Sequence, residues 1–250
     1  MTAAPVVSVV LPARNEDAAI AQLLSDIKAA LAQVPHEIIV VDDGSTDGTV
    51  PAVLACMAQG PGLRLLRHAA SCGQSAALRS GILVAQGRLI ATLDADGQNP
   101  ASELPRVLQP LLDAAAAADI GLVQGQRQRR QDTWTRKAAS RIANGIRNAL
   151  LRDGVRDSGC GMKAFPRAVY LTLPFFDHIH RFMPAMVQRE GFRVVVVDVS
   201  HAERLGGRSN YSNLQRALVG IVDLLGAAWL IRRRRRPAAT EVEPPSSATP

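Results

Sequence analysis

Short apolar runs alternate with amphipathic stretches along the first half of the chain. Five runs rich in Val, Ile and Leu are bounded by turn residues, which is typical of buried strands. They cover residues 6–11, 37–41, 63–66, 89–93 and 120–123. The stretches between them carry apolar side chains at helical spacing and cover residues 17–32, 49–57, 74–85 and 100–118. This alternation predicts an α/β fold with a mostly parallel sheet flanked by helices, to which residues 192–199 add a late strand.

Polar clusters follow three of the predicted strands. They are Arg14-Asn15-Glu16 after the first run, Asp42-Asp43 after the second and Asp94-Ala95-Asp96 after the fourth. In parallel α/β sheets, ligands bind beyond the carboxyl ends of the strands. One such cluster alone would be an ordinary turn. Three clusters at corresponding strand ends indicate a single binding site.

The Asp94 and Asp96 pair is the main candidate for a metal site. Strand side chains alternate, so both carboxylates point to the same side if the extended geometry reaches residue 96. Two like charges so close repel each other unless a cation lies between them, and Mg²⁺ or Mn²⁺ prefers such oxygen ligands. Gln98 offers a carbonyl oxygen two residues further on. The chain has neither a G-x-x-x-x-G-K-[ST] nor a G-x-G-x-x-G motif, so metal and arginine are expected to hold any phosphate.

Composition and charge narrow the class of protein. At 250 residues, 47% of them hydrophobic, the chain can bury a sizeable core in one large domain. Its formal charge is +7, and five consecutive arginines occupy residues 232–236. Cys56, Cys72 and Cys160 show no C-x-x-C spacing, so we expect no disulfide or zinc framework and a reducing compartment. Residues 1–5 show no leader pattern, and no apolar stretch of about 20 residues predicts a transmembrane helix.

Arginines also cluster after the strand predicted at residues 120–123. We interpret Arg127 as a phosphate ligand, because a guanidinium binds phosphate with two parallel hydrogen bonds. Further candidates are Arg129, Arg130, Arg136 and Arg141. A solvated basic loop is the alternative. Nucleic acid is not favoured as a partner, because aromatic residues make up only 4% of the chain and no stacking series accompanies the arginines.

The histidines and Cys160 give weaker signals. His178, His180 and His201 lack the spacing of a metal triad, so we expect structural roles for them. Cys160 lies between two glycines without an activating base nearby in the sequence, which favours a tightly packed small residue over a nucleophile.

Five motifs carry a resemblance to a known family. They are P-A-R-N-E at residues 12–16, V-D-D-G-S-T-D-G-T at 41–49, D-A-D-G-Q-N-P at 94–100, D-S-G-C-G-M-K-A-F at 157–165 and H-A-E-R-L-G-G-R-S-N-Y at 201–211. Together they resemble the family 2 glycosyltransferases with the GT-A (Rossmann-like) fold. The closest subgroup is the polyprenyl-phosphate, dolichol-phosphate mannose synthase-like transferases. The resemblance extends over about residues 6–212. It implies metal-dependent, inverting transfer of a sugar from a UDP- or GDP-linked nucleotide-diphosphate sugar to a polyprenyl phosphate.

On the donor side, the resemblance implies roles for residues in the first three motifs. Pro12, Asn15 and Glu16 would border the nucleoside. Asp43 would hydrogen-bond the base, and Asp94 would lie at the ribose and the metal. The implied ligands of Mg²⁺ or Mn²⁺ are Asp94, Asp96 and Gln98.

On the acceptor side, the resemblance assigns Asp157 a catalytic or orienting role. It also implies a mobile loop with Arg204 and Ser209 as acceptor ligands, in which Asn210 replaces the usual lysine. An acceptor phosphate is already an anion, so Asp157 would orient groups or hold a cation rather than abstract a proton. The residues expected to carry catalysis are Asp96, Arg127 and Asp157.

Residues 214–231 predict an apolar helix that Gln215, Arg216 and Asp223 interrupt. It is too polar for a membrane span and suits an amphipathic helix lying at a membrane surface. Trp229 and the arginines behind it would contact an anionic headgroup layer, each arginine contributing about 1 kcal/mol. The alternative is a helix that docks on the body of the protein and ends in a solvated basic segment. The following residues 237–250 are expected to be disordered.

These expectations define one glycosyltransferase domain over residues 1–231. Within it, residues 6–120 would bind nucleotide sugar and metal, 121–212 the acceptor, and 213–231 the membrane surface, followed by a basic cluster and tail at 232–250. The favoured function is that of a polyprenyl-phosphate sugar synthase, peripherally associated with the cytoplasmic face of the cell membrane. A membrane protein that holds the C-terminal helix is a further partner left open by the sequence. Two alternatives remain: direct glycosylation of a saccharide or other hydroxyl, with Asp157 as base, and a non-catalytic basic module that binds membrane or nucleic acid.

Overall fold

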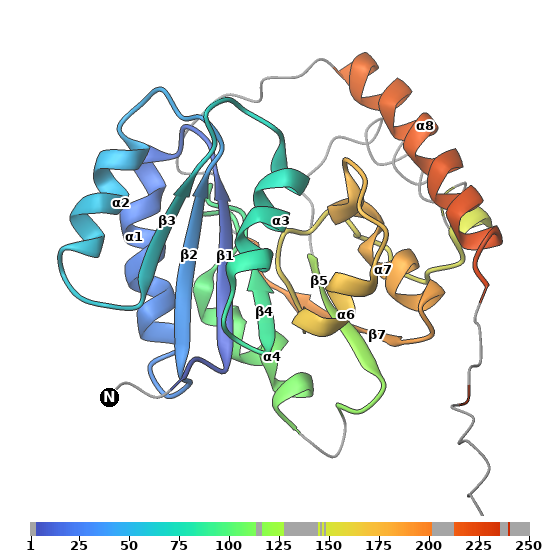
Figure 1. Cartoon of the computed structure of the whole chain (residues 1–250), viewed down its shortest axis with the longest axis horizontal. Helices are drawn as coiled ribbons and strands as arrows, with labels where there is room; N and C mark the ends of the chain where they lie inside the picture. Colours follow the sequence, from blue (N-terminus) through green and yellow to red (C-terminus); the bar gives the residue numbers. More distant parts are fainter. Residues whose placement is uncertain are drawn as a thin grey trace, which may run out of the picture.

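A seven-stranded sheet forms the centre of the computed structural model, in the strand order β3-β2-β1-β4-β6-β5-β7 (Figure 1). The structure describes residues 4–113, 117–127, 145, 147, 149–201, 213–235 and 240. The strands are β1 (Val7–Ala13), β2 (His36–Asp42), β3 (Leu63–Arg67), β4 (Leu89–Thr92), β5 (Ile120–Arg127), β6 (Lys163–Pro166) and β7 (Arg193–Val199). All neighbours pair in parallel except β6, which is antiparallel to both β4 and β5. The mostly parallel α/β fold predicted from the sequence is therefore confirmed.

Helices cover both faces of this sheet because the strand side chains alternate between them. The helices are α1 (Asp17–Ala30), α2 (Thr49–Met57), α3 (Gln74–Val84), α4 (Leu104–Leu112), α6 (Arg167–Thr172), α7 (Ile179–Arg189) and α8 (Asn213–Arg232), with a 3₁₀ turn at Ala101–Glu103. Val9 and Leu11 of β1 pack with α1, α2 and α4 on one face. Val10 packs with α3, α6, α7 and the end of α8 on the other.

The helix expected at residues 100–118 is shorter than predicted. It ends at Leu112, because Asp113 has the extended backbone torsions φ −75° and ψ 101°. The periodic apolar residues Leu104, Val107, Leu108 and Leu111 all lie within the shorter helix and are buried.

One edge of the sheet collects the polar motifs. Strands β1, β2 and β4 run parallel and end together, with Ala13 paired to Asp42 and Val10 paired to Thr92. Since β6 runs the other way, its first residue, Lys163, pairs with Thr92 and arrives at the same edge. The last residue of β5, Arg127, also ends there. The fold thus brings together segments that lie far apart in the sequence.

The C-terminal helix α8 forms where the sequence predicts it and lies against α7 (Figure 1). Arg189 of α7 donates a hydrogen bond from Nε to the carbonyl of Leu230, 3.0 Å away. Within the described parts of the chain, no helix has both the length and the apolar content needed to cross a bilayer. Contact of α8 with a membrane surface, and the division of the domain into donor and acceptor halves, stay predictions.

Candidate active site

A cavity of about 340 Å³ lies at the carboxyl edge of β1, β2 and β4. Four carboxylates line it, from Glu16, Asp43, Asp94 and Asp96, against the single guanidinium of Arg14. We call it the acidic pocket. Pro12 also lines it, so five of the donor-side residues singled out in the sequence meet here: Pro12, Glu16, Asp43, Asp94 and Asp96.

Asp94 is held by neutral donors. Its Oδ1 accepts a hydrogen bond from Gln74 Nε2 at 2.7 Å, and its Oδ2 accepts a longer one from Asn99 Nδ2 at 3.4 Å. Burial, and next the charge of Asp96, raise the pKa of the Asp94 carboxyl above its usual range. A Cβ added at Gly161 would lie 2.3 Å from the Asp94 carboxylate, so only glycine fits there. Asp94 is thus fixed in place beside a second carboxylate that opposes its ionisation.

The carboxylates of the acidic pocket suit a divalent cation. Burial contributes most to the raised pKa of Asp94 and the charge of Asp96 comes next, and a bound cation would relieve the repulsion between these two carboxylates. Oxygen ligands of this kind are those that Mg²⁺ and Mn²⁺ prefer. The structure brings Asp94 and Asp96 to the pocket wall. Gln98 donates a hydrogen bond from its backbone N–H to Asp96 Oδ1, at 3.1 Å. A metal-ligand role for the Gln98 side chain stays a prediction.

The carboxylate of Asp43 is hydrogen-bonded to other residues of the protein. Its two oxygens contact His68 Nδ1, Ser71 Oγ, and the backbone N–H groups of Cys72 and Gly73, at 2.7–2.9 Å. Burial opposes its ionisation, but these hydrogen bonds hold its pKa below the usual value. Asp43 therefore fixes the loop that precedes α3 and forms part of the pocket wall. Hydrogen bonding of Asp43 to a base stays a prediction.

Asn15 links two loops and is not among the residues that line the pocket. Its backbone N–H donates to Ser45 Oγ at 2.9 Å, and its Oδ1 accepts from the Thr46 N–H at 2.9 Å. Asn15 adopts φ 56°, a left-handed conformation that asparagine tolerates better than most residues. It thereby connects the loop after β1 to the loop after β2. Contact of Asn15 with a nucleoside stays a prediction.

A second cavity, of about 330 Å³, adjoins the first through Gln74, which lines both. Three guanidiniums line it, against one carboxylate: Arg127, Arg156 and Arg181 against Asp157. We call it the basic pocket. Its other lining residues are Ser158, Gly159 and His180.

Arg127 and Asp157 form a bidentate ion pair in the basic pocket. Arg127 Nε lies 2.6 Å from Asp157 Oδ2, and Arg127 Nη2 lies 2.8 Å from Asp157 Oδ1. Hydrogen bonding to Asp157 raises the pKa of Arg127. The carboxylate therefore holds the guanidinium in a fixed plane, the geometry that suits recognition of a phosphate or a second carboxylate.

Lys163 is a buried cation in the motif at residues 157–165 that was not predicted as a site residue. Its side chain is 3% exposed, and its ammonium donates a hydrogen bond to the carbonyl of Cys160. Burial lowers its pKa, while nearby Cys160, Asp94 and Asp157 act in the opposite direction. The signal available in the sequence was a lysine with the apolar residues Met162 before it and Ala164-Phe165 after it.

Other residues of the site were reached only through the fold. Gln74, Arg156, Ser158 and Arg181 line the basic pocket, and His180, expected to be structural, also faces it. Cys160 is fully buried, as expected for a packed small residue. The proposed acceptor ligands Arg141, Arg204 and Ser209 lie outside the described residues.

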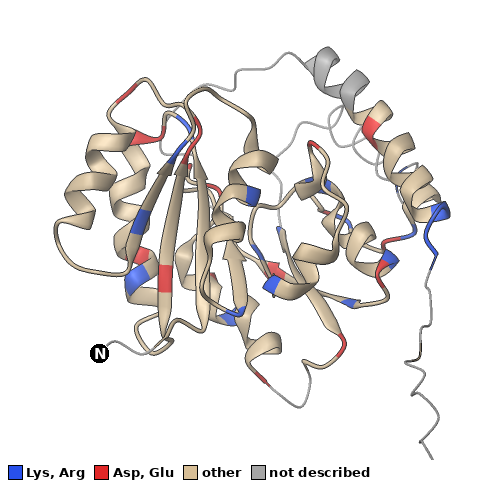
Figure 2. Cartoon of the chain, in the orientation of Figure 1, with Lys and Arg blue, Asp and Glu red and all other residues tan. Residues whose placement is uncertain are grey.

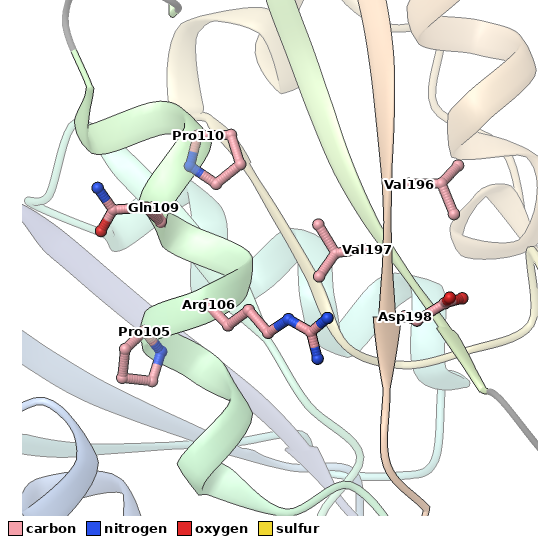
Figure 3. A pocket seen from close by; sticks show the side chains of 7 residues that line it. All are labelled: Pro105, Arg106, Gln109, Pro110, Val196, Val197 and Asp198. Atoms are coloured by element: carbon pink, nitrogen blue, oxygen red, sulfur yellow. The ribbon is translucent and has the colours of Figure 1, made fainter.

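A third cavity, of about 600 Å³, lies elsewhere, between α4 and the edge strand β7 (Figure 3). Arg106 and Val197 point toward each other across it, and Asp198 lies at its β7 side. It shares no lining residue with the acidic or basic pocket. It also lacks the excess of one charge that marks those two.

The fold is the GT-A type that the sequence motifs imply, and it is similar to the fold of solved synthases. Glucosyl-3-phosphoglycerate synthase from Mycobacterium tuberculosis, solved with Mn²⁺, uridine diphosphate and glucosyl-3-phosphoglycerate, superposes with a TM-score of 0.68 at 22% sequence identity. The match covers 91% of this chain and 80% of that one. At this identity the likeness concerns the fold.

The sequence comparison identifies the family. Residues 8–173 match the family described as Glycosyl transferase family 2, to which this chain therefore belongs. An undecaprenyl-phosphate 4-deoxy-4-formamido-L-arabinose transferase from Aeromonas hydrophila is 35% identical over 208 residues, covering 82% of this chain and 62% of the relative. A dodecaprenyl-phosphate galacturonate synthase from Rhizobium johnstonii is 34% identical over 236 residues, covering 92% and 68%. The chain thus spans less than two thirds of the Aeromonas relative.

Proposed function

We propose that this protein transfers a sugar from a nucleotide-diphosphate sugar to a polyprenyl phosphate. The observation that carries the proposal is the pair of adjoining pockets of opposite charge that share Gln74. Carboxylates suit a metal-bound diphosphate, and guanidiniums suit a phosphate that binds without metal. Relatives that are named for undecaprenyl-phosphate and dodecaprenyl-phosphate products support this choice of acceptor.

Asp94 and Asp96 would hold the Mg²⁺ or Mn²⁺ ion in the acidic pocket, with Gln98 as a further ligand. When bound, such an ion stabilises the negative charge that develops on the departing nucleoside diphosphate. The protein supplies the positioning: Gln74 and Asn99 orient the Asp94 carboxylate, and Gly161 leaves it the room it occupies.

In the basic pocket, Asp157 orients Arg127 rather than acting as a base. Both oxygens of Asp157 already accept hydrogen bonds from the guanidinium. The acceptor phosphate oxygen is an anion, so no proton has to be removed before it attacks the sugar. Attack from the side opposite the leaving group would invert the configuration at the anomeric carbon.

Helix α8 supports a location at the membrane surface. Ile221, Val222, Leu225 and Trp229 are between 56% and 70% exposed. At 3.6 residues per turn they fall within about 100° of one another around the helix. The basic residues 232–235 follow directly at its end (Figure 2). We propose that this face lies on the anionic cytoplasmic leaflet, where a polyprenyl phosphate resides.

The test is turnover by purified protein with Mn²⁺ or Mg²⁺, a panel of UDP- and GDP-sugars and detergent-dispersed undecaprenyl phosphate. We expect one donor to release its nucleoside diphosphate only when both metal and lipid phosphate are present. Asp96→Ala should lower the rate by about 100-fold or more, because a charge-stabilising group is lost. Asp26→Ala, at an exposed position on α1, is the matched control and should retain full rate.

Two outcomes would point to the other functions. Turnover with a saccharide or other hydroxyl acceptor, in the absence of lipid phosphate, would favour direct glycosylation with Asp157 as base. Failure to bind any nucleotide sugar in the presence of metal would contradict an enzymatic role and leave a basic binding module. Co-sedimentation with vesicles tests whether α8 contacts a lipid surface or a protein partner. Binding to vesicles made of anionic lipid alone would support a lipid surface, because a protein partner is absent from them.

A further inference from the structure

The three arginines of the basic pocket differ in how many hydrogen bonds and ion pairs they make with the rest of the protein. Arg127 is held by Asp157 through two hydrogen bonds, so much of its charge is compensated. Arg156 donates from Nε to Gln126 Oε1 at 3.3 Å and has further contacts. Arg181, an exposed residue in the first turn of α7, has no recorded side-chain hydrogen bond or ion pair with any residue that the structure describes. Of the three guanidiniums, Arg181 is therefore the one most available to an incoming anion.

His180 adds a neutral donor beside Arg181. Its side chain is 8% exposed and lines the basic pocket, and Nδ1 lies 2.7 Å from Ser75 Oγ. Ser75 Oγ also accepts a long hydrogen bond, 3.5 Å, from the His180 backbone N–H, so its own hydroxyl proton is free to point at Nδ1. In that arrangement the ring proton is on Nε2. Within the described part of the chain, Nε2 has no hydrogen-bond partner. Burial, and next the charges of Lys163 and Arg181, lower the pKa of His180 well below its usual value, so the ring is a neutral donor.

We propose that Arg181 and His180 bind the phosphate group of the polyprenyl phosphate acceptor in the basic pocket. The inference rests on the function proposed above and assigns its acceptor site to α7. A phosphate monoester offers three oxygens that accept hydrogen bonds from a guanidinium fork and an imidazole N–H at the same time. Because Gln74 borders both pockets, a phosphate held there lies next to the acidic pocket, where the donor would bind.

The connection between α7 and α8 favours a lipid phosphate over free phosphate. His178, directly before α7, places Nδ1 2.8 Å from Asp223 Oδ2 of α8. Asp223 lies in the same helix as the exposed apolar residues Val222 and Leu225. The first turn of α7, which carries the phosphate ligands, is therefore joined to the helix proposed to contact lipid.

The experiment compares Arg181→Gln, Arg181→Lys and His180→Gln with the unmodified full-length protein. Binding of farnesyl phosphate, inorganic phosphate and metal–nucleoside diphosphate is measured by calorimetry, and steady-state kinetics give KM and kcat for undecaprenyl phosphate. Arg181→Gln should raise the farnesyl phosphate Kd and the acceptor KM by about 10- to 100-fold, as expected for loss of a charge-assisted hydrogen bond. Nucleoside diphosphate affinity should change by less than about twofold. Arg181→Lys should restore part of the loss.

Arg106→Gln is the matched control, since it removes a guanidinium from a different helix and a different cavity. Arg181 is exposed, so its substitution should leave the unfolding temperature unchanged, and His180→Gln provides a second, independent loss of a donor. An unchanged farnesyl phosphate Kd in both variants would overturn the inference. A matching loss of nucleoside diphosphate affinity would assign the site to the donor instead, and equal effects on inorganic phosphate would show a phosphate site without lipid selectivity.

The binding measurements also separate this inference from the proposed function. Farnesyl phosphate binding that depends on Arg181, without sugar transfer from any donor, would keep the anion site and overturn the function. Sugar transfer to undecaprenyl phosphate that is indifferent to Arg181 and His180 would keep the function and overturn the site.

Discussion

The acidic and basic pockets lie side by side at one edge of the sheet but carry opposite excess charge. In the acidic pocket, the groups that hydrogen-bond Asp94 are the neutral amides of Gln74 and Asn99, and the charges of Lys163 and Arg127 only partly offset its burial and the charge of Asp96. In the basic pocket, the carboxylate of Asp157 neutralises one guanidinium and leaves an excess of positive charge. The first arrangement requires a cation before it can bind a diphosphate, whereas the second can bind an anion directly. The difference predicts that metal removal affects donor binding and leaves acceptor binding intact.

Gly161→Ala should have the largest effect, and only on the acidic pocket. The new Cβ would overlap the Asp94 carboxylate, which would be displaced from Gln74. A displacement on the order of 1 Å can lower a rate by about 100-fold, and overpacking costs about 1–3 kcal/mol of unfolding free energy. Turnover and metal-dependent nucleotide affinity provide the measurements. Gly226→Ala, where no atom lies within 4 Å, is the control and should be neutral. Normal nucleotide affinity in Gly161→Ala would show that Asp94 does not hold the metal.

Asp157→Asn tests the assignment of an orienting role in the basic pocket. The substitution keeps the shape but releases the Arg127 guanidinium from its charge partner. We expect kcat to fall by about 10- to 100-fold through loss of positioning, with acceptor affinity maintained or increased because the pocket becomes more positive. The measurement is a kcat and KM comparison over a range of pH. Loss of the acidic limb of the pH–rate profile, on which the rate rises as a base is deprotonated, would instead identify Asp157 as a general base.

Asp43→Asn should weaken the acidic pocket more mildly. The amide retains one acceptor oxygen, so two of the four contacts with the loop before α3 are lost. Leaving buried donors unsatisfied costs about 1–3 kcal/mol, which we expect to appear in unfolding free energy and as a nucleotide Kd raised by about tenfold. Urea unfolding and calorimetry provide these values. A loss of nucleotide affinity with full stability would show that Asp43 contacts the base, as the family resemblance implies.

Glu37 is a control carboxylate at the opposite end of β2, outside both pockets. Burial opposes its ionisation, but hydrogen bonds from Arg64, the Gln86 N–H and Ser8 hold its pKa below the ordinary 4.5. Since the folded-state pKa is the lower one, its stabilising contribution is present above about pH 4.5 and is lost as the pH falls toward the folded-state value. Glu37→Gln should therefore lower unfolding free energy at pH 7, by about 1–3 kcal/mol, and less at pH 4. Nucleotide and prenyl phosphate affinities should be unchanged, and any change would mean that the pockets depend on the far edge of the sheet.

The sequence could predict the strands and the carboxylates of the acidic pocket because both are local signals. Apolar runs ending in polar clusters specify strands and their carboxyl ends, and parallel pairing brings those ends to one edge. Asp43, Asp94, Asp96 and Glu16 could be placed there for this reason. The alternation also predicted β7. It failed for β6, a strand of only four residues that begins with a lysine and ends with a proline.

The basic pocket was harder to predict because its residues are assembled by tertiary contacts. Gln74 reaches Asp94 only because α3 packs on the same sheet, across 20 residues of sequence. His180 meets Ser75 across 105 residues, and nothing local distinguishes it from a structural histidine. Arg127 could be chosen from sequence as a phosphate ligand, but its pairing with Asp157 could not.

By itself, the sequence determined the α/β class, the family and which carboxylates meet at one edge of the sheet, since strand periodicity and short motifs depend only on neighbouring residues. The tertiary structure alone decided that Asp43 is hydrogen-bonded to the loop before α3, that Lys163 is buried at the site, and that α7 contributes to the basic pocket. These features depend on which surfaces pack against the sheet and which charges then lie close together. Such distances arise only when the chain has folded.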